Sequence, residues 1–169
     1  DDRYIVIGVS STVSDEIRYA PASDPGAFTV LAPRERDLEY SAEHLGDRWL
    51  ILTNADGAKN FKLVEAPSAS QSRKDWKDVV AHDPDVFLET FEPFDAFIAL
   101  GERSDALERV RILRADGGSE YVKADEPAYS MGLSANTEHD TTRLRYTYTS
   151  LTTPATTYEL DVATGERTL

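Results

Sequence analysis

The sequence predicts an all-β protein, and three observations carry this prediction. Short runs of aromatic and aliphatic residues return about every 45 residues. About a dozen residues after each of them comes a run in which apolar and polar residues alternate, as a half-buried strand requires. Groups of Gly, Asn and Asp separate the runs and are typical of turns. Four short antiparallel strands per repeat are the signature of a β-propeller, so we expect a propeller fragment of about three and three-quarter four-stranded blades.

The strands follow the same order in each repeat. Leading strands are expected at residues 38–41, 86–91 and 128–133, and the first repeat has none. Second strands, the aromatic-rich runs, are expected at 4–7, 49–52, 96–100 and 144–148. Third strands are expected at 16–19, 61–64, 109–112 and 157–160, and fourth strands at 28–31, 76–80, 120–122 and 167–169. The corresponding blades span approximately residues 1–33, 34–82, 83–125 and 126–169.

A helix over residues 34–46 is the competing local interpretation. Leu38, Ala42 and Leu45 stand at helical spacing there, and Gly46 is a plausible C-cap. The helical pattern does not recur at the matching places of the other repeats, whereas the strand pattern does, so strands are favoured. In the second strands, Trp49, Phe97 and Tyr146 are expected to pack between neighbouring sheets.

The composition excludes several classes of protein. The chain has no cysteine, which excludes disulfides, thiolate catalysis and Cys-based zinc sites. A net charge of −13 repels phosphate backbones, so we expect no nucleic-acid partner. No apolar run is long enough to cross a bilayer, so we expect no membrane partner. The lack of cysteine is consistent with a cytoplasmic protein, while a periplasmic location stays open.

Residues that could carry chemistry do not form a recognisable catalytic or metal set. His44, His82 and His139 lack metal-ligand spacing and are expected to be solvated loop residues. Ser134 stands in a Gly-x-Ser-x-Asn stretch, which lacks the second glycine that a nucleophile elbow needs. We therefore predict no catalytic residue, no metal and no cofactor.

The carboxylates leave one further interpretation open. A glycosidase needs two of them about 5 to 10 Å apart across a cleft, which sequence spacing cannot show. In so acidic a chain, clustering by chance is expected. The stretch from Asn54 to Gly57 lacks the later ligands of a calcium loop and is interpreted as a turn. The clustered carboxylates are Glu35, Asp37, Glu39, Glu43, Asp125 and Glu126.

Several segments resemble the prolyl oligopeptidase family of serine peptidases, and the oligopeptidase B branch in particular. The strongest are Asp-Glu-Pro-Ala-Tyr at 125–129, Asn-Thr-Glu-His-Asp-Thr at 136–141 and Leu-Arg-Tyr-Thr-Tyr-Thr-Ser-Leu-Thr-Thr-Pro at 144–154. The resemblance implies a seven-bladed propeller that covers a C-terminal α/β-hydrolase domain and admits only short peptides to it. The Ser, Asp and His of the triad belong to that domain, which this sequence lacks, so the chain is expected to be inactive alone. The resemblance further implies peptide substrates, with cleavage after Arg or Lys in the full protein.

The resemblance also suggests which residues lie near substrate. On the inner, leading strands the candidates for lining the central tunnel are Tyr40, Glu43, Glu89, Tyr129 and Met131. The most family-specific motif contributes Arg145, Tyr148, Thr149 and Ser150, for which blade packing and turn hydrogen bonding is the simpler interpretation.

Two other functions and one further partner remain open at this stage. A free-standing propeller could serve as a protein-binding module, and a propeller with central carboxylates could be a glycosidase. An arc of fewer than four blades leaves blade faces and a strand edge uncovered at its ends. Two copies could cover these surfaces by pairing, so a homodimer of the fragment is expected.

Overall fold

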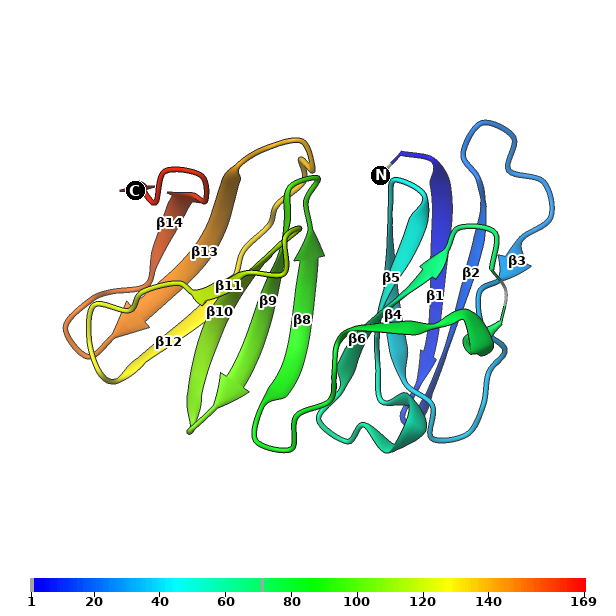
Figure 1. Ribbon diagram of the computed structural model, residues 1–169, viewed down its shortest axis with the longest axis horizontal. Coiled ribbons are helices and arrows are strands. Elements are labelled where there is room, and N and C mark those ends of the chain that lie inside the picture. The colour runs from blue at the N-terminus through cyan, green and yellow to red at the C-terminus, as the bar shows by residue number, and fades with distance from the viewer. Residues whose placement is uncertain (1, 71) are drawn as a thin grey trace. The chain divides into compact units, whose positions relative to one another are not determined.

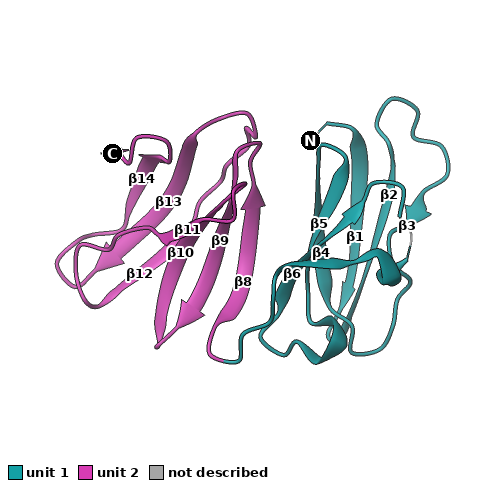
Figure 2. Cartoon of the chain, viewed as in Figure 1, with its two compact units in different colours: residues 1–84 teal, residues 85–169 magenta. Residues whose placement is uncertain are grey.

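The computed structural model describes residues 2–70 and 72–169, and Asp1, the first residue of the first predicted blade, lies outside them. The described chain is built from four antiparallel sheets, which confirms the all-β propeller fragment (Figure 1). It forms two compact units, residues 1–84 and 85–169, each with two sheets (Figure 2). Sequence composition does not mark this division. We describe each unit by itself.

The first unit contains a three-stranded sheet and a four-stranded sheet. The three-stranded sheet has the order β1(Tyr4–Ser11), β2(Ser14–Pro21) and β3(Thr29–Val30). The four-stranded sheet has the order β4(Tyr40–Leu45), β5(Arg48–Thr53), β6(Lys62–Pro67) and β7(Lys77–Val80). The prediction of a strand rather than a helix before Gly46 is confirmed. Short 3-10 turns at Ala55–Gly57 and Arg73–Asp75 interrupt the connections of this sheet.

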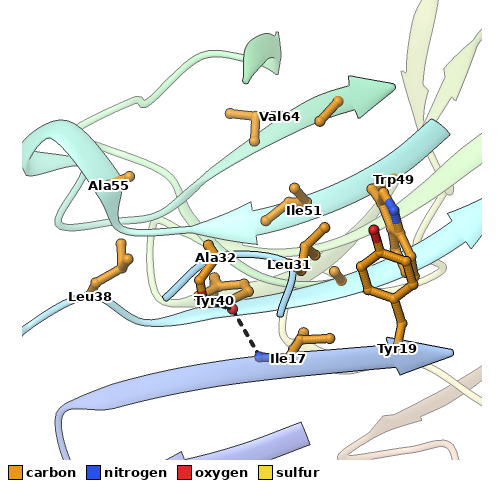
Figure 3. Packing of buried hydrophobic residues seen from close by; sticks show 12 residues of the cluster. Ile17, Tyr19, Leu31, Ala32, Leu38, Tyr40, Trp49, Ile51, Ala55 and Val64 are labelled. Atoms are coloured by element: carbon orange, nitrogen blue, oxygen red, sulfur yellow. Dashed lines mark hydrogen bonds between the residues drawn. The ribbon is translucent and has the colours of Figure 1, made fainter. Parts of the chain in front are cut away.

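The core of the first unit lies between its two sheets. Trp49 and Ile51 from β5 meet Ile17 and Tyr19 from β2, and all four are buried. Figure 3 shows the Tyr40 hydroxyl directed at the backbone N–H of Ile17, from which it accepts a hydrogen bond of 2.9 Å. The same hydroxyl donates to the carbonyl of Ala32 at 2.7 Å. Tyr40 therefore ties β4 to the neighbouring sheet by both of its hydrogen-bonding functions.

The second unit contains two four-stranded sheets. The first has the order β8(Phe87–Pro93), β9(Phe97–Ser104), β10(Leu107–Arg114) and β11(Ser119–Tyr121). The second has the order β12(Tyr129–Leu133), β13(Arg143–Ser150), β14(Thr156–Asp161) and β15(Arg167–Thr168). Strands occur at every place where the sequence predicts one.

One face of each sheet supplies the core of the second unit. Phe97, Val110 and Ile112 from the β8–β11 sheet join Leu144 and Tyr146 from the β12–β15 sheet in one buried cluster. Trp49, Phe97 and Tyr146 are thus buried against a neighbouring sheet, as expected. Alternation explains the arrangement, because every second residue of a strand faces the same side.

A β-bulge interrupts β8. Leu88 pairs with Glu102 and Thr90 with Gly101, so Glu89 has no opposite residue on β9. A Cβ atom on Gly101 would lie 2.5 Å from the Thr90 methyl carbon, so this position has room for glycine alone. The bulge was not predicted, and it changes the direction in which the side chain of Glu89 points.

The described part of the chain contains no helix that is long and apolar enough to cross a membrane.

Candidate functional site

A hydroxyl-rich hairpin lies at one end of the β12–β15 sheet and is held by many hydrogen bonds. It connects β13 to β14, and the carboxylate of Glu126, which precedes β12, holds it in place. Glu126 accepts from the hydroxyl of Ser150 at 3.0 Å and from those of Thr152 and Thr153 at 2.8 Å each. The Tyr148 hydroxyl donates to it as well and accepts from its backbone N–H at 3.1 Å. These donors, Tyr148 first and then Thr152 and Thr153, lower the pKa of Glu126 to about 2.

The hairpin also closes on itself. The backbone N–H of Ser150 donates to the carbonyl of Thr153 at 3.0 Å, and the Thr149 hydroxyl donates to the same oxygen at 3.1 Å. The Ser150 hydroxyl accepts from the backbone N–H groups of Thr152 and Thr153. Three of the four motif candidates, Tyr148, Thr149 and Ser150, therefore pack the sheet and fix a turn.

The fourth motif candidate, Arg145, lies on the polar face of the same sheet. Its Nε donates to Glu159 at 3.2 Å, and Arg143 donates to the same carboxylate at 2.7 Å. The hydrogen bond from Arg143 lowers the pKa of Glu159, and that from Arg145 adds to the effect. A polar hollow of about 320 Å³ opens here, between this face and the loop around Asn136 and Glu138. Two guanidinium groups share one carboxylate, so the hollow has hydrogen-bond donors for an acidic or carbonyl-rich ligand.

A chain of polar contacts links the bulge to the neighbouring sheet. Arg103 contacts the carboxylates of Glu89 at 2.8 Å and Glu108 at 3.2 Å. Glu108 in turn accepts from the hydroxyl of Ser130 on β12. The predicted candidate Glu89 is therefore one member of a network that spans β8, β9, β10 and β12. Sequence spacing could not reveal it, because the network depends on the bulge and on the approach of two sheets.

The five inner-strand candidates are divided between the two units, with Tyr40 and Glu43 in the first and Glu89, Tyr129 and Met131 in the second. Tyr40 and Met131 are buried in the cores of the first and second units. Glu43 points outward from β4, and Tyr129 stacks on Tyr148 with ring centroids 5.7 Å apart. Burial raises the pKa of the Tyr40 hydroxyl. That the five inner-strand candidates line a tunnel stays a prediction.

The expectation that His44 is a solvated loop residue is wrong. His44 lies on β4 and is 3% exposed, with its ring 4.8 Å from that of Trp49 and 4.6 Å from that of Tyr4. Its Nε2 is 2.7 Å from the Ser68 hydroxyl. Burial lowers the pKa of His44 to about 4, and the Arg3 cation adds to the effect. The alternation Tyr40, Ala42, His44 on β4 is the signal that could have placed this ring inside.

Ser134 and His139, two further residues considered for chemistry, both lie in loops of the second unit. Ser134 follows β12 and gives its backbone N–H to Arg145, with strand β13 rather than a helix as the next element. His139 lies in the loop before β13, where its Nδ1 is 2.9 Å from the carbonyl of Pro93. Within residues 2–70 and 72–169, no group of three or more His, Cys, Asp or Glu is arranged to hold a metal ion.

The clustered carboxylates near the start of β4 mainly serve structure. Glu35 pairs with Arg73 at 2.6 Å, and the carboxylate of Glu39 accepts a hydrogen bond from the Asn54 side-chain amide at 3.3 Å. Asp56 pairs with Lys62 at 3.1 Å across the short 3-10 turn. The interpretation of residues 54–57 as a turn is confirmed.

A buried charged cluster on the β8–β11 sheet was missed. The side chain of Glu102 is completely buried and accepts from Arg111 Nε at 2.9 Å and from Arg111 Nη2 at 2.5 Å. Its second oxygen accepts from the Tyr121 hydroxyl at 3.0 Å. The cost of burying the Glu102 carboxylate is offset, because each of its two oxygens accepts a hydrogen bond. The residues lie on three strands, so no local pattern in the sequence marks them.

The fold, with its four antiparallel sheets, defines the class: a β-propeller fragment. The chain belongs to the family described as the N-terminal β-propeller domain of prolyl oligopeptidase, whose family model matches residues 1–169. The resemblance noted in the sequence is thereby confirmed.

Relatives and solved structures support this membership. The chain is 67% identical over 167 residues to dipeptidyl aminopeptidase BI of Pseudoxanthomonas mexicana, covering 99% of this chain and 23% of that protein. It is 31% identical to Protease 2 of Moraxella lacunata, over 98% of this chain and 24% of that protein. The structure of oligopeptidase B from Leishmania major superposes with a TM-score of 0.89 at 27% identity, over 98% of this chain and 25% of that one. The chain thus spans about a quarter of the length of these proteins.

Proposed function

We propose that this chain is a non-catalytic part of the propeller that gates a serine oligopeptidase. The observation that carries the proposal is the match of the N-terminal propeller family to residues 1–169. The high structural similarity to oligopeptidase B, with a TM-score of 0.89, supports it. This membership favours the peptidase propeller over a free-standing binding module and over a glycosidase.

In this proposal the chain's partner is a C-terminal α/β-hydrolase domain of the same protein, which supplies the triad. A propeller that covers an active site restricts access by size, so short or extended peptides enter and folded proteins do not. The chain's own contribution is rigidity, since each of its sheets is fixed to a neighbour through a buried cluster. Peptides are therefore the proposed substrates.

Two substrate preferences have support from the relatives. We propose cleavage after Arg or Lys from the resemblance of the sequence to oligopeptidase B, and the name of the 67% identical relative adds removal of dipeptides from a free N-terminus as the alternative. The full-length protein should be given two fluorogenic substrates that both end in Arg, one N-terminally blocked and one a free dipeptide. Turnover of the blocked substrate supports an oligopeptidase. Turnover of the free dipeptide alone supports the aminopeptidase and rejects cleavage within peptides.

The non-catalytic role is tested with a fluorophosphonate probe that labels reactive serines. The full-length protein should be labelled and active, and the chain of residues 1–169 should be neither. Stoichiometric labelling of the chain that disappears in Ser134→Ala would reject the proposal.

We also propose that the isolated chain self-associates. Strand β1 is an edge strand whose described partner is β2, and Ile5, Val6, Ile7 and Val9 on it are each more than 40% exposed. An exposed apolar edge offers backbone groups and surface to a second copy. Sedimentation equilibrium at micromolar concentration should show a dimer. A single species at the monomer mass, independent of concentration, would reject self-association and leave the gating role untouched.

A further inference from the structure

Leu151 is exposed to a degree that no other large apolar residue inside the described chain approaches. Its exposed fraction is 98%, whereas the other exposed large hydrophobic residues, apart from the final Leu169, reach at most 44%. Leu151 stands at the tip of the β13–β14 hairpin, between Ser150 and Thr152. A fully exposed leucine is unfavourable in water unless another surface covers it.

Hydrogen bonds fix the backbone of the hairpin on both sides of this leucine. Four hydroxyl groups around the tip donate to Glu126, and two backbone N–H groups after Leu151 donate to Ser150. A loop bonded in this way has already lost its conformational freedom before any partner binds. A segment that is already rigid loses little conformational entropy on binding, which favours its use as a contact.

The course of the chain indicates which partner lies at this end of the sheet. Tyr129, the first residue of β12, pairs with Ser150, so β12 starts at the hairpin end. Strand β15 runs antiparallel to β14, which starts at the hairpin, and so β15 is directed back toward it. In the family, this propeller is the N-terminal domain, and the related proteins are about four times as long as this chain. Chain that continues β15 therefore emerges on the side of Leu151.

We propose that Leu151 is a docking contact of the propeller, inserted into an apolar pocket of the catalytic domain of the same protein. The inference rests on the proposed function for the existence of that domain, and it adds the residue through which the two are held together. The hydroxyls beside Leu151 are already bonded to Glu126, so the tip offers its partner one apolar side chain and no unsatisfied charge.

The test compares thiol accessibility at two positions of the full-length protein. Leu151→Cys places a thiol at the hairpin tip, and Ala163→Cys places one in the exposed turn between β14 and β15, at the other end of the same sheet. Alkylation by iodoacetamide, followed by mass spectrometry of the two peptides, gives the rate at each site. We expect alkylation at position 151 to be at least about tenfold slower in the native protein, and equal rates in urea. Equal rates in the native protein would overturn the inference.

A photo-crosslinking residue at position 151 identifies the covering surface. Cross-links within one chain to segments after residue 169 support the proposal. Cross-links to a second, isotopically labelled copy, or to other blades only, overturn it. Peptidase activity of the same preparation reports on the proposed function separately, so an active enzyme with a rapidly alkylated tip would reject the docking contact alone.

Discussion

The first unit buries a histidine and the second unit buries a glutamate, and the two side chains are accommodated in opposite ways. In the first unit, the ring of His44 lies among Tyr4 and Trp49 and is kept neutral, with a pKa lowered to about 4. In the second unit, the side chain of Glu102 is completely buried and is bonded to the guanidinium of Arg111 and the hydroxyl of Tyr121. One unit thus avoids a buried charge, and the other compensates it.

The stability of the two units is therefore expected to respond to different changes, to pH in the first unit and to loss of a charged partner in the second. A neutral buried imidazole is stable until acid forces a proton onto it, so the first unit is sensitive to pH. A buried ion pair is sensitive to the loss of either partner, because the remaining charge stays desolvated. Both tryptophans, Trp49 and Trp76, belong to the first unit, so their fluorescence follows that unit, whereas far-UV circular dichroism follows both.

The largest effect is expected from breaking the ion pair. Arg111→Met removes the cation that neutralises Glu102 and should lower the free energy of unfolding of the second unit by about 3–5 kcal/mol. The loss should appear in urea unfolding followed by circular dichroism and should leave the tryptophan transition unchanged. The double variant Glu102→Leu with Arg111→Met should recover most of the loss, since apolar side chains of similar size can replace a buried pair. A double variant as unstable as the single one would show that the charge is not the cause.

A smaller effect is expected from acidification of the first unit. The folded pKa of His44, about 4, lies below its ordinary value of 6.5, so the folded chain binds fewer protons than the unfolded chain in this range. The stability that His44 contributes is therefore complete above pH 6.5 and is lost as the pH falls toward 4. The loss should be on the order of 2–3 kcal/mol by pH 4, measured from the urea midpoint of tryptophan fluorescence.

The control for this prediction is His44→Phe, which keeps an aromatic ring and cannot take up a proton. The urea midpoint of this variant should fall less between pH 6.5 and 4 than that of the parent protein, because position 44 no longer takes up a proton. Identical pH profiles for the two proteins would contradict a neutral, buried His44.

The smallest effects are expected from removing single hydroxyls around the two groups. Ser68→Ala removes the hydroxyl next to His44 Nε2, and Tyr121→Phe removes the third hydrogen bond to Glu102. Each should cost about 1 kcal/mol, because the main contacts of the buried group remain. Losses above about 3 kcal/mol at Tyr121 would mean that the tyrosine, and not Arg111, is the principal partner of Glu102.

Much of the fold could be predicted from the sequence because strand formation leaves a local signal. Alternating side chains, turn residues and a period of about 45 residues located each strand within a few residues. The bulge at Glu89 could not be predicted, since it depends on how Thr90 fits against Gly101 on the neighbouring strand. His44 was placed in solvent because its polar neighbours outweighed its position in the alternation.

The site could be predicted only as far as the family motif reached. Tyr148, Thr149 and Ser150 were located, but Glu126, the carboxylate that holds them, was considered only as a member of a chance cluster. The hydroxyl groups that donate to Glu126 lie on β13 and its hairpin, more than 20 residues later in the chain. The sequence alone does not show that these groups lie close to Glu126. The Glu102 cluster was missed for the same reason, since its three residues lie on β9, β10 and β11.

Gating by size, the proposed role of this chain in a peptidase, is tested most directly by varying the length of the substrate. The full-length protein should be given peptides of about 8, 16 and 32 residues with one identical cleavage site, and an unfolded protein that contains the same site. We predict that kcat/KM falls steeply with length and that the site in the long unfolded protein is hardly cleaved. Equal kcat/KM at every length would contradict a gate built from this propeller.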